Sequence, residues 1–401
     1  QLTSKVASSA HIEYHARIIA QKYLARELIT FTATVQDKAF DETIDVEDLM
    51  QEAEGKLFEI SQRNVKKDVT QINPVIKEAI DMLEIAANRK DGLSGLRTGF
   101  DGLDKMTSGW QNSDLIIIAA RPAMGKTAFV LSMAKNMAVN HNIPVALFSL
   151  EMSNVQLVNR LIVNVCEIEG EKIKSGRLDN YEWEQLDFKI KDLYNAPIYV
   201  DDTPSLSVFE LRTKARRLVR EHGIKIIIID YLQLMNASGM NFGSREQEVS
   251  TISRSLKGLA KELNIPIIAL SQLNRGVESR QGAEGKRPQL ADLRESGAIE
   301  QDADMVCFIH RPEYYKITED ERGNSLVGLA EIIIAKHRNG AVGDVRLRFK
   351  SNFAKFMNID DDVPVRIFSS SKNQEDPLES MPPIPAAGAD FLAPGNKEVP
   401  F

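Results

Sequence analysis

Short apolar runs alternate with longer amphipathic segments over residues 95–368. The runs are rich in Ile, Val and Leu, which is typical of strands buried on both faces. The segments between them, such as 153–167, 207–222 and 246–263, are long enough for helices. This alternation predicts an α/β domain with a twisted, mostly parallel sheet covered on both faces. The predicted strands are Leu115–Ala119, Val145–Leu150, Ile198–Val200, Ile224–Ile229, Ile267–Leu270, Met305–Ile309, Leu329–Ala335, Val345–Phe349 and Lys355–Asn358. The last of these follow one another through short turns, so we expect them to end the sheet in an antiparallel arrangement.

The first 65 residues have a different pattern, with apolar positions spaced for helices. One stripe is formed by Ile12, Ala16, Ile19, Tyr23, Leu24 and Leu28, and a second by Val46, Leu49, Ala53, Leu57 and Ile60. Two such helices are short for a self-sufficient core. We therefore expect residues 1–65 to be part of a larger all-helical N-terminal domain.

A polar segment and one isolated helix form the predicted linker over residues 66–94. The helix is predicted to begin at Asn73-Pro74, with the Asn as N-cap and the Pro at the first helical position. Its apolar face contains Ile76, Ala79, Ile80 and Leu83. That face either packs on its own domain or docks on a neighbouring subunit, and the sequence leaves both readings open.

Composition and charge limit the class of protein. The 401 residues suit two domains with linkers, and the net charge of −7 argues against a uniformly basic surface while allowing a local basic channel for nucleic acid. Both cysteines, Cys166 and Cys307, lie in apolar runs, which favours a reducing compartment. The sequence contains neither a membrane-length apolar stretch nor a secretory signal, so we expect a cytoplasmic protein without membrane contact. Gln1 as the first residue indicates a processed chain or a fragment.

A phosphate-binding loop is predicted between the first strand of the α/β region and the helical segment after it. The motif and its flank comprise Arg121, Pro122, Ala123, Met124, Gly125, Lys126, Thr127 and Ala128. In such a loop the backbone N–H groups face an anion, the lysine reaches the β- and γ-phosphates, and the Thr hydroxyl is a ligand of Mg²⁺. Ala120 stands where the first glycine of the motif is usual, which requires a negative φ there.

Three further polar residues follow predicted strands. Asp230 ends the run Ile226–Ile229, as expected for the carboxylate that orders the Mg²⁺ shell in phosphate-loop NTPases. Glu151 follows the strand after the phosphate-loop helix, where a carboxylate orients and deprotonates water; the alternative is a helix-capping role beside Ser153. Gln272 ends a later strand, where it either senses the γ-phosphate or is an ordinary polar end residue.

Two cations, Lys336 and Arg338, end a late apolar strand and lead into a turn. Residues two apart on a strand point to the same side. If these cations face the nucleotide of another subunit, they act as an arginine finger, which contributes on the order of a thousandfold to hydrolysis. The alternative is a solvated basic strand end.

These motifs together resemble the bacterial replicative DNA helicases of the DnaB family. The resemblance runs from Thr98-Gly99-Phe100-Asp101-Gly102-Leu103-Asp104 to about Phe356. It comprises RPAMGKT at 121–127, FSLEM at 148–152, IIIIDYLQLM at 226–235, SQLNR at 271–275, DLRESGAIEQDADMV at 292–306 and AKHRNG at 335–340. The helical start of the chain is similar to only the later part of the family's N-terminal domain.

The resemblance implies a RecA-like phosphate-loop NTPase core in a hexameric ring on single-stranded DNA, moving 5′ to 3′ on ATP with Mg²⁺. It also implies primase and a helicase loader as partners. Glu151 would be the catalytic base, Asp230 the Mg²⁺-shell acid, and Gln272 the link between nucleotide state and DNA.

The same resemblance assigns further contacts to nucleotide and DNA. Arg160 is similar to a phosphate-side arginine of the family, and Lys336 and Arg338 would reach the γ-phosphate of the adjacent protomer. The loop containing Arg294, Glu295 and Gly297 resembles the family's pore loop on the DNA backbone. A charged arginine and a glycine that permits close approach suit such a grip.

Two other functions are compatible with parts of this pattern. A RecA-like recombinase shares the phosphate loop, Glu151 and Asp230, but the segments at 292–306 and 335–340 favour the helicase. An ATP-gated replisome scaffold would recruit primase with little hydrolysis, and the presence of Glu151 and Arg338 argues against it.

Residues 369–401 have the composition of a disordered tail, because six of the fifteen prolines lie there among Ser, Gly, Ala and acidic residues. The chain ends at Pro400-Phe401, which resembles the Pro-Phe tip of bacterial single-stranded-DNA-binding proteins. A terminal carboxylate beside an exposed ring is a compact recognition element. The tail is therefore either an unused end or a contact to other replisome proteins.

Overall fold

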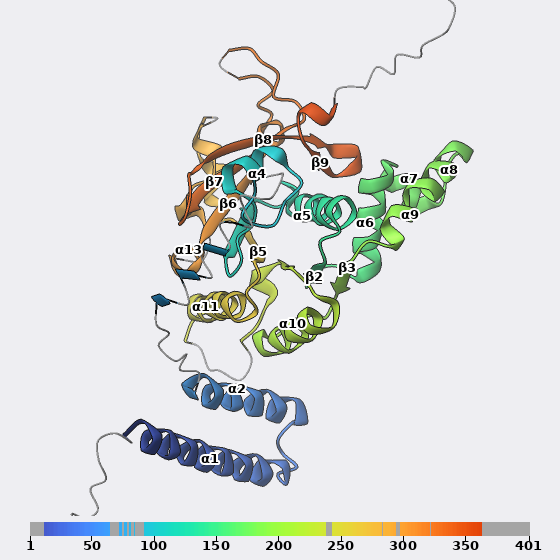
Figure 1. Cartoon of the computed structure of the whole chain (residues 1–401). Helices are drawn as coiled ribbons and strands as arrows, with labels where there is room; N and C mark the ends of the chain where they lie inside the picture. Colours follow the sequence, from blue (N-terminus) through green and yellow to red (C-terminus); the bar gives the residue numbers. More distant parts are fainter. Residues whose placement is uncertain are drawn as a thin grey trace, which may run out of the picture. The chain divides into compact units, whose positions relative to one another are not determined.

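The structure is a computed structural model in which residues 12–64, 72–73, 76–77, 80–81, 84, 92–237, 243–282, 284–293, 297–320 and 322–362 are described. The described residues comprise a helical pair, part of a linker helix, and an α/β domain (Figure 1). None of the described helices is long and apolar enough to cross a lipid bilayer.

The helical pair consists of α1 (Ile12–Ala39) and α2 (Val46–Asn64). The turn between them is held by Asp41, whose Oδ1 accepts hydrogen bonds from the Thr43 backbone N and hydroxyl at 3.0 and 2.6 Å. The predicted first stripe does not form a core, since Ile12 and Ile19 are 68% and 69% exposed. Two helices of this length leave much of their apolar surface uncovered.

The linker helix is described only at seven positions. Ile72 and Asn73 are already helical, so the prediction of Asn73 as N-cap is wrong: the helix begins before that residue. Ile76 and Ile80 are helical and about half exposed, at 47% and 48%. Pro74, Ala79 and Leu83, which complete the predicted helix start and apolar face, lie outside the described residues.

The α/β domain is built on a nine-stranded sheet in the order β3-β2-β4-β5-β1-β6-β7-β8-β9. The strands from β3 to β6 in this order are parallel, and those from β6 to β9 pair antiparallel, which confirms the mostly parallel sheet with an antiparallel end. The bounds are β1 Leu115–Ala120, β2 Val145–Ser149, β3 Ile198–Asp201, β4 Ile226–Asp230, β5 Ile267–Gln272, β6 Met305–His310, β7 Leu329–His337, β8 Gly343–Lys350 and β9 Lys355–Met357.

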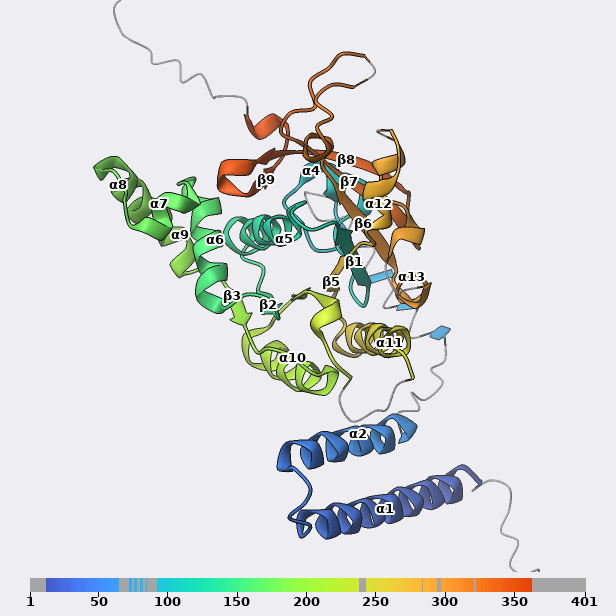
Figure 2. The ribbon, with the colours of Figure 1, turned by 180° about the vertical axis from the view of Figure 1, so that it is seen from behind.

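Helices cover both faces of this sheet (Figures 1 and 2). One face is covered by α4 (Asp101–Thr107), α5 (Lys126–Lys135), its π-helical extension η3 (Asn136–Asn140) and α6 (Asn154–Cys166). The other is covered by α10 (Val208–His222), α11 (Arg245–Leu263) and α13 (Gly297–Asp302). Successive residues of β1 alternate between the two cores: Ile116 and Ile118 join the first, Ile117 and Ala119 the second. Burial on both faces is the reason why the central strands are continuous apolar runs.

Shorter elements surround the domain. Beyond α6, helices α7 (Gly170–Ser175), α8 (Asn180–Lys189) and α9 (Lys191–Tyr194) extend outward beside the β3 edge (Figure 1). The remaining short elements are α12 (Gly276–Ser279), η4 (Leu232–Leu234), η5 (Glu284–Lys286), η6 (Leu290–Asp292), η7 (Pro312–Tyr315), η8 (Ser351–Phe353) and η9 (Asp360–Asp362). In open α/β sheets the carboxyl ends of the strands face the ligand site. This edge carries the predicted phosphate loop.

Candidate nucleotide-binding site

The phosphate loop connects β1 to α5. Ala120 lies within β1 and needs no glycine, which agrees with the expected negative φ. Gly125 has φ of 96°, and a Cβ added there would lie 3.1 Å from Cε2 of Phe356. Glycine is therefore required both by the left-handed backbone and by the close approach of β9. Ala123 also has a positive φ, of 65°. Lys126 begins α5, and its Nζ donates a hydrogen bond to the Ala120 carbonyl at 3.2 Å.

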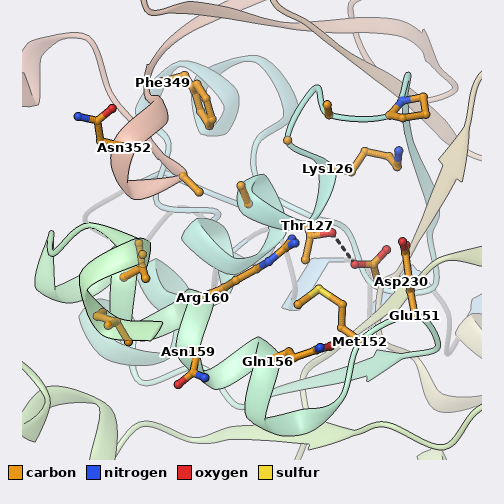
Figure 3. A pocket seen from close by; sticks show the side chains of 18 of the residues that line it. Lys126, Thr127, Glu151, Met152, Gln156, Asn159, Arg160, Asp230, Phe349 and Asn352 are labelled. Carbon is orange, nitrogen blue, oxygen red and sulfur yellow. Dashed lines mark hydrogen bonds between the residues drawn. The ribbon is translucent and has the colours of Figure 1, made fainter. Parts of the chain in front are cut away.

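The Thr127 hydroxyl donates a hydrogen bond to Oδ2 of Asp230 at 2.7 Å (Figure 3). Asp230 is the last residue of β4 and is 2% exposed. Burial raises the pKa of this carboxyl, the bond from Thr127 lowers it, and the charge of Glu151 raises it further. Burial also lowers the pKa of the Lys126 ammonium, against the opposing charges of Asp230 and Glu151. The hydroxyl, the carboxylates and the ammonium therefore share one electrostatic environment.

Strand pairing places Glu151 beside Asp230. Ser149 of β2 is paired with Asp230 of β4, and the Leu150 backbone N donates to the Asp230 carbonyl at 2.7 Å. The capping reading of Glu151 is wrong, because α6 is capped by Ser153 with a reciprocal contact from Gln156. The carboxylate of Glu151 instead lines the cleft.

The cleft has a volume of about 940 Å³. Its wall joins residues from six parts of the sequence: the phosphate loop, the end of β2 with α6, α7, the end of β4, the end of β5, and the end of β8 with the β8–β9 connection. Gln272 lines it from the end of β5, next to the phosphate loop, since it is paired with Ala120 of β1. Arg160 extends from α6 toward Thr127 (Figure 3). Pro122, Ala123, Gly125, Lys126, Thr127 and Ala128 also line it.

Two residues of the predicted loop direct their side chains elsewhere. The Arg121 guanidinium is buried, donating from Nε to Glu278 Oε1 at 2.9 Å and from Nη1 to the Leu273 carbonyl at 2.8 Å. Met124 is 1% exposed and packs in the core between the sheet and α5. Both side chains therefore anchor the loop to the rest of the domain and do not line the cleft.

Lys336 and Arg338 lie at the opposite edge of the sheet from the phosphate loop of the same chain. β7 is antiparallel to β6 and pairs His337 with Met305, the first residue of β6. β6 is parallel to β1, so the end of β7 lies at the amino end of β1, whereas the phosphate loop follows its carboxyl end. Both side chains bind carbonyls of α13: Lys336 those of Glu300 and Gln301, Arg338 that of Gln301. The fold therefore separates these cations from the cleft.

The predicted DNA-contacting loop is only partly described. Arg294 and Glu295 lie outside the described residues. Gly297 is the first residue of α13, the helix whose carbonyls accept hydrogen bonds from Lys336 and Arg338.

Several residues of the cleft were not found by sequence reasoning. Tyr231, which follows Asp230 through a cis peptide bond, lines the cleft, as do Phe349 and Asn352 from the β8–β9 region. The Arg311 guanidinium lies 3.9 Å from the centroid of the Phe349 ring and donates to the Ala123 carbonyl at 3.3 Å. Tyr231 directly follows Asp230 within the segment 226–235, so its place in the sequence is a signal for it. No local motif marks Phe349 and Asn352, since they approach the loop only through strand order.

A family model described as DnaB-like helicase C terminal domain matches residues 95–358. This chain belongs to the DnaB-like helicase family. It is 45% identical over 360 residues to the replicative DNA helicase DnaB of Geobacillus stearothermophilus, covering 90% of this chain and 78% of that protein. To the replicative DNA helicase DnaB of Pasteurella multocida it is 41% identical over 374 residues, covering 91% and 78%.

Solved structures agree with this family membership. A DnaB-like replicative helicase, described with its interactions with primase, matches with a TM-score of 0.69 and 37% identity, covering 89% of this chain and 81% of that chain. A second solved structure, described as an ATPase domain, matches with a TM-score of 0.66 and 40% identity, covering 73% of this chain and 100% of that chain. The core is thus RecA-like, and the chain is an ATP-dependent replicative DNA helicase.

Proposed function

We propose that the cleft binds ATP with Mg²⁺ and that its carboxylates divide the chemistry of hydrolysis between them. The observation that carries this proposal is the Thr127–Asp230 hydrogen bond at the mouth of the phosphate loop. A hydroxyl and a carboxylate are the oxygen ligands that Mg²⁺ takes in nucleotide sites, where phosphate and water complete its shell. When bound there, Mg²⁺ neutralises phosphate charge.

The side chains of the cleft have distinct tasks in this proposal. Lys126 holds the phosphates from the loop, and Arg160 approaches them from α6. Glu151, exposed at the end of β2, orients the attacking water and takes its proton. Gln272, a neutral amide at the end of the neighbouring strand β5, contacts the γ-phosphate without adding charge.

Lys336 and Arg338 complete the site of an adjacent subunit. Their position at the far edge of the sheet is incompatible with a role in the cleft of their own chain, but it suits a ring in which one subunit's far edge faces the next subunit's cleft. We propose that six subunits form a ring around single-stranded DNA in the cytoplasm. The loop containing Arg294, Glu295 and Gly297 contacts the DNA backbone, and the ring moves along the strand from 5′ to 3′. Primase and a helicase loader are the proposed protein partners; primase is supported by the interactions described for the related helicase structure.

A strand-displacement assay on forked duplexes tests this function. The ring is expected to displace strands only with ATP and Mg²⁺, and only from forks with a free 5′ single-stranded arm. Particle images with a slowly hydrolysed ATP analogue and single-stranded DNA are expected to show six-membered rings or spirals. DNA-dependent ATP turnover without strand displacement would instead favour a recombinase-like motor, and negligible turnover would favour the scaffold.

A further inference from the structure

Asp304 lies in the short connection between α13 and β6 and is 5% exposed. Its Oδ2 accepts a hydrogen bond from the Leu115 backbone N at 2.8 Å and another from Lys257 Nζ. Its own backbone N donates to the Leu115 carbonyl at 2.9 Å. Asp304 is therefore held in place by the backbone of Leu115, the first residue of β1, and by the Lys257 ammonium on α11.

The other carboxylate oxygen faces Arg338. Oδ1 of Asp304 accepts from Nη1 of Arg338 at 3.4 Å, while Nη2 donates to the Gln301 carbonyl. The Arg338 backbone N also donates to the Asp304 carbonyl at 2.9 Å. A guanidinium has five N–H donors in a fixed plane. Two of them bind described residues, and the Arg338 side chain is 46% exposed, so this guanidinium is accessible to a phosphate from outside.

We propose that Asp304 is the positioning residue of the trans-acting Arg338. This inference rests on the proposed function, in which Arg338 completes the cleft of the neighbouring subunit. A long, exposed arginine samples many rotamers, and holding it in one of them before the phosphate arrives lowers the entropic cost of the transition state. A rigid, buried carboxylate that is itself held by a second set of partners is suited to this task.

The neighbouring carboxylate of Asp114 provides a matched control. It is buried like Asp304, and its Oδ1 lies 3.9 Å from the same Lys257 ammonium. Among the interactions of the described residues, however, the carboxylate hydrogen-bonded to Arg338 is that of Asp304. Asp114→Asn therefore perturbs the same buried cluster without removing the partner of the guanidinium.

The test uses the full chain assembled into rings. Asp304→Asn keeps an oxygen that accepts from the Leu115 N–H and removes the charge that faces Arg338. We expect kcat for DNA-stimulated ATP hydrolysis to fall about tenfold, the scale of one charge-assisted hydrogen bond, with KM for ATP nearly unchanged. Asp114→Asn is expected to retain the kcat of the unmodified chain. An unchanged kcat in Asp304→Asn would overturn the inference.

Subunit mixing separates positioning from a general defect of the fold. Asp304→Asn subunits mixed with Lys126→Ala subunits should recover turnover, because some interfaces then combine an intact cleft with an intact, correctly held Arg338. Asp304→Asn subunits mixed with Arg338→Ala subunits should not recover turnover, because Arg338 is then either absent or wrongly held at every interface. Recovery with Arg338→Ala, or recovery with neither, would overturn the inference.

A third mixture tests the proposed function by itself. Arg338→Ala and Lys126→Ala subunits should complement each other in mixed rings. If they do not, Arg338 does not act in trans, and the proposed function and the role of Asp304 both fall. If these two variants complement each other but Asp304→Asn subunits do not show the recovery pattern described above, only the role of Asp304 is excluded.

Discussion

The hydroxyl of Thr127 and the carboxylate of Asp230 are 2.7 Å apart, although 103 positions separate them along the chain. One residue stands in the first turn of α5 and the other ends β4. Their contact brings the phosphate loop, β4 and, through the pairing of β2 with β4, Glu151 into one cleft. The loop, the two carboxylates and the surrounding arginines are therefore open to separate substitution.

Removal of the proposed base should stop hydrolysis without preventing binding. Glu151→Gln keeps the shape of the side chain, so a fluorescent ATP analogue should bind with nearly normal affinity, while ATP turnover falls by at least ~100-fold. Glu184→Gln, at an exposed position of α8, is a control that should turn over normally. A near-normal rate in Glu151→Gln would exclude this residue as the base.

Asp230→Asn should abolish ATP hydrolysis and, at higher pH, increase the thermal stability of the folded protein. Burial raises the pKa of Asp230 above its ordinary value of 3.8, so the folded protein keeps a proton that the unfolded chain has already lost. The resulting stability is present at low pH and is lost as pH rises through the raised pKa.

Asp230→Asn does not titrate there and still accepts a hydrogen bond from Thr127. Without nucleotide and Mg²⁺, the Tm difference between variant and unmodified protein should therefore grow in favour of the variant as pH rises from about 4. ATP hydrolysis should be lost at every pH. Thermal denaturation across pH measures this, and a difference independent of pH would contradict the raised pKa.

Arg121 of the phosphate loop and Arg160 of the cleft wall should have opposite phenotypes. Arg121→Ala removes a buried guanidinium and leaves the Leu273 carbonyl without its donor, so we expect a loss of about 1–3 kcal/mol in the free energy of unfolding. Arg160→Ala affects an exposed side chain of the cleft, and it should weaken nucleotide binding with little change in stability. Denaturant unfolding and nucleotide titration of both variants measure this. A stable Arg121→Ala protein with weak nucleotide binding would reverse the assignment.

The proposed DNA loop should grip the backbone without reading sequence. Arg294→Ala is expected to weaken binding of single-stranded oligonucleotides about equally for all sequences and to reduce the slope of log K against log salt by roughly 0.7. Binding isotherms at several salt concentrations on homopolymeric and mixed oligonucleotides measure this. A loss confined to particular sequences would indicate base contacts instead.

Deletion of residues 372–401 should leave ATPase and unwinding intact, because the sheet and the cleft are complete before Asp362. The tail itself lies outside the described residues. Calorimetry at low salt with a replisome protein that binds Pro-Phe tips distinguishes its two readings. Equal binding by full-length and truncated protein identifies an unused end. A loss that Phe401→Ala reproduces identifies a docking element. Reduced unwinding by the isolated truncated ring would contradict both.

The sequence alone determined the strands and the chemistry at their ends. A strand buried on both faces needs a continuous apolar run, and a phosphate loop needs glycine and lysine at set positions, so both are visible as local patterns. Glu151 and Asp230 were predicted because each directly follows such a run, and Gln272 because it lies two residues beyond one. The carboxyl ends of parallel strands meet at one edge, and the structure brings all three to one cleft.

Tertiary structure decided the relations that depend on strand order and side-chain direction. Only the position of β1 between β5 and β6, with β7 antiparallel, places Arg338 at the edge opposite its own phosphate loop. Only packing turns Arg121 toward Glu278 and brings Phe349 to the cleft. Asp304 meets Leu115 and Arg338 across long separations in the chain. Such contacts have no local signature, because the sequence pattern specifies which residues are buried but not which strands become neighbours.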